Sequence, residues 1–361
     1  MSRQWFGVFV CAFDPIHSGH LEAARRAAES SGAGGVFLVP WTGSAPMKDR
    51  LMMLTAAAGG DRRLIPFAPE FTPDQDALPD LVRAVRRRCP DSDLSLMVPA
   101  GLFPDASLSA LRGRGLRAIV LPSGGDLSSA ALRKELSGKD LSEGRLPASL
   151  PVPVAEYVAC RGLYGVPSRV PESGPWIDAL FAALKPHRFS HSLAVAYTAR
   201  ELALRFGEDP LLAEKAGLLH DCAKNLPLKE MRALVEEAGI SLDRETLEST
   251  ALLHSVAGAC LARKAYGVED PVILEAMSYH NTGYPGMTRL AMCVCLGDSI
   301  EPTRSPYPLL SEVRGLAETS LEKALLRSLE GTAAYVRAGK GSVHPRTLET
   351  VSWLKTLPAA R

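Results

Sequence analysis

The stretch of residues 211–224, LLAEKAGLLHDCAK, decides the character of the C-terminal half of this chain. Its apolar run predicts a helix that ends at the adjacent pair His220-Asp221. The pair stands in a longer series of metal-ligand residue types: His191, His220, Asp221, His254, His280 and Asp298. Imidazoles and carboxylates bind borderline divalent metals, and paired ions support the hydrolysis of phosphate esters and anhydrides. The series therefore predicts a metal-dependent site.

The composition is typical of a globular protein in a reducing compartment. The 361 residues leave room for two or three domains, and the net charge of +1 favours neither nucleic acid nor an anionic membrane. The seven cysteines include no CxxC pair, which argues for reduced thiols. The N-terminus lacks a signal-peptide pattern, and no apolar run reaches the length of a membrane span. We expect a cytoplasmic protein.

Short apolar runs alternate with helical patterns up to about residue 165. The predicted strands are residues 5–10, 35–39, 94–98 and 117–121, and the predicted helices are residues 18–31 and 154–160. Strands that alternate with helices form parallel sheets with right-handed crossovers. We therefore expect an N-terminal α/β domain with a parallel sheet.

Proline and glycine separate this half from an all-helical remainder. Residues 165–175, GVPSRVPESGP, have the composition of a linker. The expected organisation is a domain at residues 1–165, a linker at 166–180 and a helical domain at 181–361. The predicted helices are residues 190–206, 211–219, 228–238, 247–266, 271–279, 289–299, 309–329 and 344–354.

Five motifs of the helical half belong to one pattern. They are RFSHS at 188–192, AGLLHDCAK at 216–224, LH at 253–254, YHNTG at 279–283 and GDSIEPTR at 297–304. Together they resemble the HD superfamily of metal-dependent phosphohydrolases and, within it, the bacterial symmetrical diadenosine tetraphosphate hydrolases. The resemblance implies an all-α HD-domain fold and the cleavage of diadenosine tetraphosphate into two ADP. Asn281 and Gly297 depart from the family pattern, which has threonine and alanine there, but neither is an expected ligand.

The resemblance implies a site for two divalent metal ions. One ion would be held by His191, His220, Asp221 and Asp298, and Asp221 would bridge to a second ion held by His254 and His280. Iron is implied by the resemblance, whereas a site of nitrogen and oxygen donors also accepts manganese or another transition metal. The expected catalytic residues are His220, Asp221 and Lys224. The expected substrate-binding residues are Arg188, Thr282, Gly283 and Arg304, since arginine suits phosphate.

Other activities of the helical half stay open as alternatives. Gly283-Tyr284-Pro285 spells the GYP of cyclic-dinucleotide phosphodiesterases, but those enzymes carry a second histidine and a glutamate where this chain has Asn281 and Thr282. A guanosine tetraphosphate hydrolase has less support. A nucleotide-sensing protein that only binds is an alternative of another class. The expected partners are small-molecule nucleotides, namely diadenosine tetraphosphate, ATP and nicotinate mononucleotide, with no nucleic acid and no membrane.

A phosphate-binding motif follows the first predicted strand. Residues 13–21, FDPIHSGHL, open a helix whose N-terminal N–H groups can meet a phosphate, with Gly19 allowing close approach. With residues 46–54 and 128–133, the motif resembles the HxGH nucleotidylyltransferases, most closely the nicotinate mononucleotide adenylyltransferases. The resemblance implies a Rossmann-like fold that binds ATP with magnesium, with His20 catalytic. It implies nucleotide binding by His17, Gly19, His20, Lys48, Ser128, Ser129 and Arg133.

The N-terminal half departs from this family at functional positions. Residues 10–12 are Val-Cys-Ala where the family has two glycines and a threonine, and their side chains would crowd the substrate. Residues 99–101 are Pro-Ala-Gly where it has Gly-Ala-Asp, and Ala130 replaces a threonine. The retained residues suit a triphosphate, because adenylyl transfer needs mainly positioning and charge neutralisation. Three outcomes stay open: synthesis of the NAD precursor deamido-NAD, nucleotide binding without turnover, and transfer to another acceptor.

Overall fold

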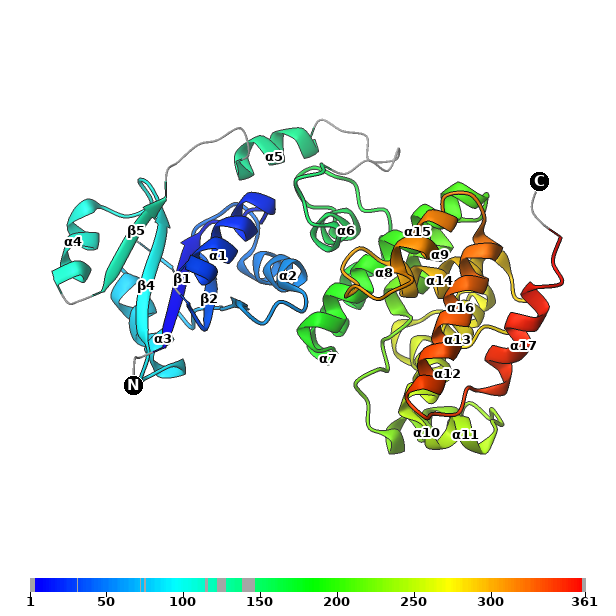
Figure 1. Ribbon diagram of the computed structural model, residues 1–361. Coiled ribbons are helices and arrows are strands. Elements are labelled where there is room, and N and C mark those ends of the chain that lie inside the picture. The colour runs from blue at the N-terminus through cyan, green and yellow to red at the C-terminus, as the bar shows by residue number, and fades with distance from the viewer. Residues whose placement is uncertain are drawn as a thin grey trace. The chain divides into compact units, whose positions relative to one another are not determined.

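The computed structural model describes residues 4–30, 32–71, 73–74, 76–113, 116–121, 128–137 and 147–358. The chain divides into two compact units, Met1–Ser168 and Arg169–Arg361. Each unit has its own secondary-structure class (Figure 1). None of the helices in the described ranges has the length and apolar character needed to cross a membrane. All seven cysteines are free thiols, as the absence of a CxxC pair predicted.

The first unit is built on a five-stranded parallel sheet in the order β3-β2-β1-β4-β5. Its strands are β1 (Trp5–Cys11), β2 (Gly35–Pro40), β3 (Leu64–Pro66), β4 (Asp93–Pro99) and β5 (Arg117–Leu121). Its helices are α1 (Ser18–Ser30), α2 (Met47–Ala58), α3 (Leu78–Arg88), α4 (Asp105–Gly113), α5 (Ser129–Ser137) and α6 (Val152–Arg161). The predicted parallel α/β sheet is confirmed. Residue 31, the last of the first predicted helix, lies outside the described residues.

Strand β3 was missed by the sequence analysis because it has only three residues and so carries no periodic signal. The other strands read clearly, since a parallel sheet covered on both faces needs apolar side chains on both. All six residues of β2 are buried. The strand order reverses between β1 and β4, and ligands of open α/β sheets bind where such a reversal occurs. This topology places the FDPIHSGHL motif at the carboxyl end of β1.

The second unit is all-helical, as predicted. Its helices are α7 (Ser173–Ala183), α8 (Pro186–Phe206), α9 (Pro210–Leu219), α10 (Leu228–Glu237), α11 (Arg244–Glu248), α12 (Thr250–Tyr266), α13 (Pro271–Tyr279), α14 (Arg289–Ile300), α15 (Leu310–Leu316), α16 (Leu321–Ala338) and α17 (Pro345–Leu354). The helix α7 begins inside the segment 166–180 that was expected to be a linker. Pro175 does not prevent it, because proline is tolerated in the first turn of a helix.

Two predicted helices are each divided in the structure. The prediction of one helix at 309–329 is wrong. The backbone of Ser320 is extended, and a new helix, α16, begins after it. The Oγ atom of Ser320 caps this helix by accepting the N–H of Lys323. The prediction of one helix at 247–266 is also wrong. Ser249 is extended between α11 and α12. Its side chain makes no capping hydrogen bond, and apolar periodicity does not detect a change of backbone direction at one residue.

Small residues let α9 and α14 approach α8 closely. A Cβ atom on Gly217 of α9 would lie 2.9 Å from the Cα of Ala196, and one on Gly297 of α14 would lie 3.3 Å from the backbone N of Ala199. Alanines on α8 complete these contacts. His220 lies one turn after Gly217, and Asp298 follows Gly297 directly. The close packing therefore determines where these two polar side chains meet.

We expect Gly217→Ala to destabilise the second unit. The added methyl group would press on backbone atoms of α8 that cannot move aside, and overpacking of this kind costs about 1–3 kcal/mol. Gly315→Ala on α15 is the matched control, because nothing lies within 4 Å of its Cβ position; it should be neutral or stabilise by up to about 1 kcal/mol. Urea denaturation followed by circular dichroism measures both. Equal effects of the two substitutions would contradict the close approach.

Candidate metal centre

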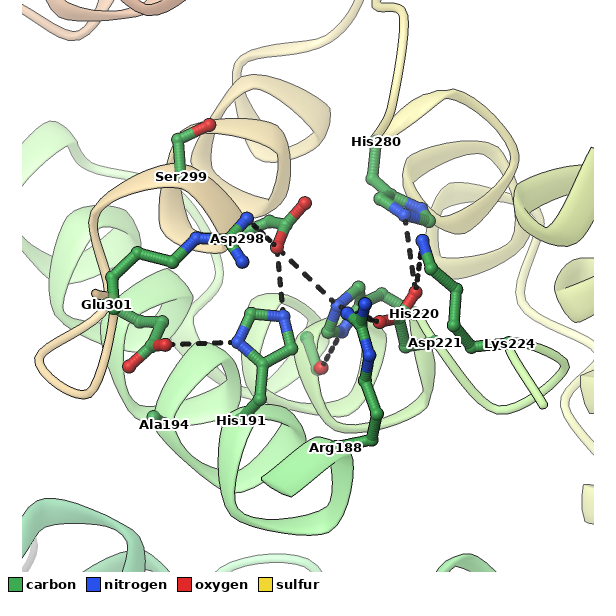
Figure 2. Close-up of polar contacts among 12 residues, drawn as sticks. Arg188, His191, Ala194, His220, Asp221, Lys224, His280, Asp298, Ser299 and Glu301 are labelled. Carbon is green, nitrogen blue, oxygen red and sulfur yellow. Dashed lines mark hydrogen bonds and ion pairs between the residues drawn. The ribbon is translucent and has the colours of Figure 1, made fainter. Parts of the chain in front are cut away.

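The six polar residues of the C-terminal series converge from five helices. His191 lies on α8, and His220 follows the last residue of α9, with Asp221 next to it. His254 lies on α12, His280 follows α13, and Asp298 lies on α14. Figure 2 shows the side chains of His191, His220, Asp221, His280 and Asp298 pointing toward one another. The four histidine side chains and Asp221 are buried.

Three of the histidines are held in the same way by the ends of their own helices. The Nδ1 atom of His220 lies 2.7 Å from the carbonyl of Gly217, and that of His280 lies 2.8 Å from the carbonyl of Met277. The Nδ1 of His254 lies 3.2 Å from its own helix carbonyl at Thr250. A carbonyl only accepts, so the Nδ1 atoms of His220 and His280 carry the proton and their Nε2 atoms present a lone pair. This tautomer is the one that a metal ligand needs.

The ligand atoms form two overlapping groups. Those of His191, His220 and Asp298 lie within 4.8 Å of one another, and so do those of His220, Asp221 and His280. His191 Nε2 is 2.9 Å from Asp298 Oδ1. His254 Nε2 is 3.1 Å from His280 Nε2 and 3.2 Å from Asp221 Oδ1. His220 belongs to both groups, and the bridging role expected of Asp221 stays a prediction.

The residues present fit a divalent metal. The Nε2 atom of His220 is buried and has no hydrogen-bond partner among the described residues. Its nearest carboxylate atoms, Asp221 Oδ2 and Asp298 Oδ1, are 3.7 and 3.9 Å away. Both distances are too long for a hydrogen bond. A buried imidazole nitrogen without a hydrogen-bond partner, together with two carboxylates, provides the kind of donor atoms that a transition metal binds.

The electrostatics favour ionised carboxylates and mostly neutral rings. Burial opposes the charge of Asp221, but the facing His220 and the hydrogen bond with His254 outweigh it and hold the pKa of Asp221 well below its usual range. The pKa of Asp298 is likewise low, because its hydrogen bond to His191 and the nearby Arg304 outweigh burial. Burial lowers the pKa of His220, and burial and neighbouring rings lower the pKa of His280 to about 3.

Cationic side chains surround this anionic pair. Arg188 donates to Asp221 Oδ2 at 3.0 Å, and Arg304 donates to Asp298 Oδ1 at 3.1 Å. The Nζ of Lys224 is 3.4 Å from Asp221 Oδ1 and 2.8 Å from His254 Nε2. All three side chains remain partly exposed. They are positively charged and accessible from solvent, as the binding of a phosphate requires.

The loop after His280 carries the two other expected substrate residues. The hydroxyl of Thr282 donates to the carbonyl of Gly283, so it serves the loop itself. Gly283 has φ of +62°, and a Cβ there would lie 2.7 Å from Thr350 on α17, so no other residue fits. The ring of Tyr284 lies 4.6 Å from that of Tyr279. These local contacts account for Gly283 and Tyr284 of the GYP tripeptide.

Glu301 is a site residue that the sequence reasoning did not select. Its Oε1 lies 3.0 Å from His191 Nδ1, and the side chain is buried. The hydrogen bonds of His191 to Glu301 and Asp298 outweigh the effect of burial and raise the pKa of His191 to about 9. The available signal was a glutamate three residues after Asp298, at the end of a helix and before a proline.

The first unit contains a cavity of about 990 Å³ at the carboxyl end of β1. Six of the seven expected nucleotide-binding residues line it: His17, Gly19, His20, Ser128, Ser129 and Arg133. Lys48 lies on α2 and is not among the lining residues. Cys11 and Ala12 also line the cavity. The predicted set is therefore brought together except for Lys48.

Several of these side chains already have partners within the unit. The Nδ1 of His20 accepts from the N–H of His17 at 3.3 Å, and its Nε2 lies 3.4 Å from Cys11 Sγ. Ser129 Oγ donates to the carbonyl of Pro15 at 2.9 Å, and Arg133 donates to the carbonyl of Asp14. The side chain at position 11 thus contacts the expected catalytic imidazole.

Comparison with known proteins divides along the same two halves. The model of the HD domain family matches residues 188–303. The symmetrical bis(5'-nucleosyl)-tetraphosphatase of Bacillus subtilis is 40% identical over 172 residues, which are 47% of this chain and 91% of that protein. A Mycoplasma genitalium protein named "Probable nicotinate-nucleotide adenylyltransferase/Ap4A hydrolase" is 25% identical over 355 residues, covering 91% of this chain and 97% of that protein. A Clostridium acetobutylicum HD superfamily hydrolase described as involved in NAD metabolism is 37% identical, with a TM-score of 0.48, covering 50% of this chain and 95% of that one.

We expect the rings of His17 and His20 to stay neutral in mildly acidic solution. Burial lowers the pKa of His17 to about 4, and burial and the neighbouring His17 lower that of His20 to about 3. The unfolded chain binds these protons first, so their contribution to stability is present above pH 6.5 and is lost as the pH falls toward 4. Ring nitrogen shifts measured by NMR test this. Titration midpoints near 6.5, as in the urea-unfolded chain, would contradict it.

Proposed function

The C-terminal half of this chain belongs to the HD-domain family that includes the symmetrical bis(5'-nucleosyl)-tetraphosphatases, and from that premise we propose that it hydrolyses diadenosine tetraphosphate to two ADP. One observation carries the proposal. Four imidazoles and two carboxylates converge, and three cationic side chains lie around them. Such a site combines metal ligands with a rim that matches a polyphosphate chain.

We propose that His191, His220, Asp221, His254, His280 and Asp298 hold two divalent ions, with iron as the preferred metal. When bound, such ions supply an activated water and neutralise charge that develops on phosphate oxygens. The match to the HD-domain family supports metal dependence. The Nδ1 contacts of His220 and His280 leave their Nε2 atoms suited to bind a metal. The preference for iron over manganese rests on the sequence resemblance alone.

Three side chains would bind and orient the polyphosphate. Arg188 and Arg304 each pair with a carboxylate of the site in the structure, and each keeps donors on its partly exposed guanidinium for phosphate oxygens. Lys224 lies close to Asp221 Oδ1 and can neutralise a phosphate as a point charge. With cations on more than one side, the central anhydride bond would be held against the ligand residues.

The first test is product analysis. The full chain, purified without oxygen and supplied with ferrous iron, is expected to convert diadenosine tetraphosphate into ADP alone. His220→Ala and Asp221→Ala should remove both bound metal and hydrolysis, because each deletes a central ligand. His20→Ala in the other unit is the control and should leave hydrolysis unchanged. AMP plus ATP as products, or full hydrolysis by Asp221→Ala, would reject the assignment.

The N-terminal cavity supports a second activity, adenylyl transfer from ATP to nicotinate mononucleotide. Six of the expected nucleotide-binding residues line one cavity, but Cys11 contacts His20 within it. Incubation with ATP, magnesium and nicotinate mononucleotide decides between the outcomes. Pyrophosphate and deamido-NAD would establish synthesis, and ATP binding without turnover would establish a binding module. Pyrophosphate release only with a different acceptor would establish transfer elsewhere.

The alternative functions of the helical half can each be tested. Cyclic dinucleotides and guanosine tetraphosphate are the substrates to try if diadenosine tetraphosphate is not cleaved. A protein that only senses nucleotides need not retain stoichiometric metal. Metal analysis of the purified chain therefore separates a hydrolase from a binding protein without any substrate.

A further inference from the structure

The four histidines of the centre differ in the partner of Nδ1. His220, His254 and His280 each place it against a neutral carbonyl of their own helix, at 2.7, 3.2 and 2.8 Å. His191 instead places it against a carboxylate, Glu301 Oε1, at 3.0 Å. A carboxylate behind an imidazole holds the proton on Nδ1 more strongly and makes Nε2 a better donor to a metal. His191 is thus the strongest imidazole donor of the set.

Glu301 is held rigidly in that position. Its carboxylate is buried, accepts the backbone N–H of Thr303, and accepts the Thr303 hydroxyl at 3.0 Å. Arg314 fixes the segment by donating to the carbonyls of Ile300 and Glu301, at 2.9 and 2.7 Å. In the described part of the chain, no lysine or arginine forms an ion pair with the Glu301 carboxylate. Its negative charge is therefore directed at His191 (Figure 2).

The two groups of ligand atoms have unequal surroundings. Each has one arginine, Arg304 on Asp298 and Arg188 on Asp221, at nearly the same distance. The group with His191 has in addition the anion of Glu301. The group with His280 has in addition the cation of Lys224, 2.8 Å from His254 Nε2. A nearby anion favours a bound cation and a nearby cation opposes it, more strongly in a buried site than in water.

We propose that the two ion positions differ in affinity and that Glu301, a positioning residue, makes the one formed by His191, His220 and Asp298 the tight position. The position formed by His220, Asp221 and His280 is the weak one, because Lys224, which lies beside Asp221 and His254, competes with the ion there. This inference rests on the proposed two-metal function. The centre then fills in order, and at limiting metal the chain holds one ion at the His191 position.

The test is binding of manganese(II) alone to the metal-free full chain, measured by equilibrium dialysis. The native protein is expected to show a tight and a weak class of site. Glu301→Gln keeps the shape and the hydrogen-bond acceptor but removes the charge, so it should weaken the tight class alone by about 10–100-fold, the usual effect of losing an outer partner of a ligand. Lys224→Met should tighten only the weak class.

Ser299→Ala is the matched control, because Ser299 adjoins Asp298 but its hydroxyl donates only to the carbonyl of Cys295 on the same helix. It should leave both classes unchanged. If Glu301→Gln does not fold, Thr303→Val, which removes one hydrogen bond to the carboxylate, should weaken the same class to a smaller extent.

Each outcome bears on one of the two proposals. Two classes of site that Glu301→Gln leaves unchanged, or weakens equally, would overturn the inference while leaving the metal-dependent hydrolase intact. A native chain that binds no metal would instead overturn the proposed function. Loss of the tight class alone, with unchanged thermal unfolding of the metal-free variant, would establish Glu301 as the determinant.

Discussion

The close packing of α9 and α14 against α8 is the constraint on which the candidate metal centre depends. A Cβ atom on Gly217 would lie 2.9 Å from the backbone of α8, and one on Gly297 would lie 3.3 Å from it. This brings His220 and Asp298 to His191, whose ligand atoms then lie within 4.8 Å of one another. Protein interiors are packed as densely as crystals of small molecules, so one added methyl group between these helices would displace the side chains of the site. The apolar core and the polar centre are therefore parts of one arrangement.

Burying two carboxylates is costly unless they are paired. In this protein the histidines and two arginines compensate Asp221 and Asp298, and the pKa values of both carboxyls stay low for that reason. The same cations remain partly exposed. An anionic interior with a cationic rim suits both a divalent ion and the phosphates of a nucleotide.

The two units use their motifs differently. In the helical unit the Nε2 atom of His220 has no hydrogen-bond partner among the described residues, and that of His280 lies 3.1 Å from His254 Nε2. In the α/β unit Ser129 and Arg133 already hold the Asp14-Pro15 backbone, and His20 contacts Cys11. Both motifs are brought together in the structure, one around a cavity and the other around a candidate metal site.

The sequence by itself determined the two fold classes, four of the five strands and the six histidines and aspartates that converge in the helical unit, because periodicity and residue type are local properties. It did not determine that Ser249 and Ser320 interrupt helices, or that a three-residue strand closes one edge of the sheet, since these depend on capping and on pairing with distant segments. Only the tertiary structure placed Glu301 behind His191, Lys224 beside His254, and His220 between both groups of ligands. The physical reason is that an imidazole's donor strength and an ion's affinity depend on which charges lie within a few ångströms, and packing across five helices decides that.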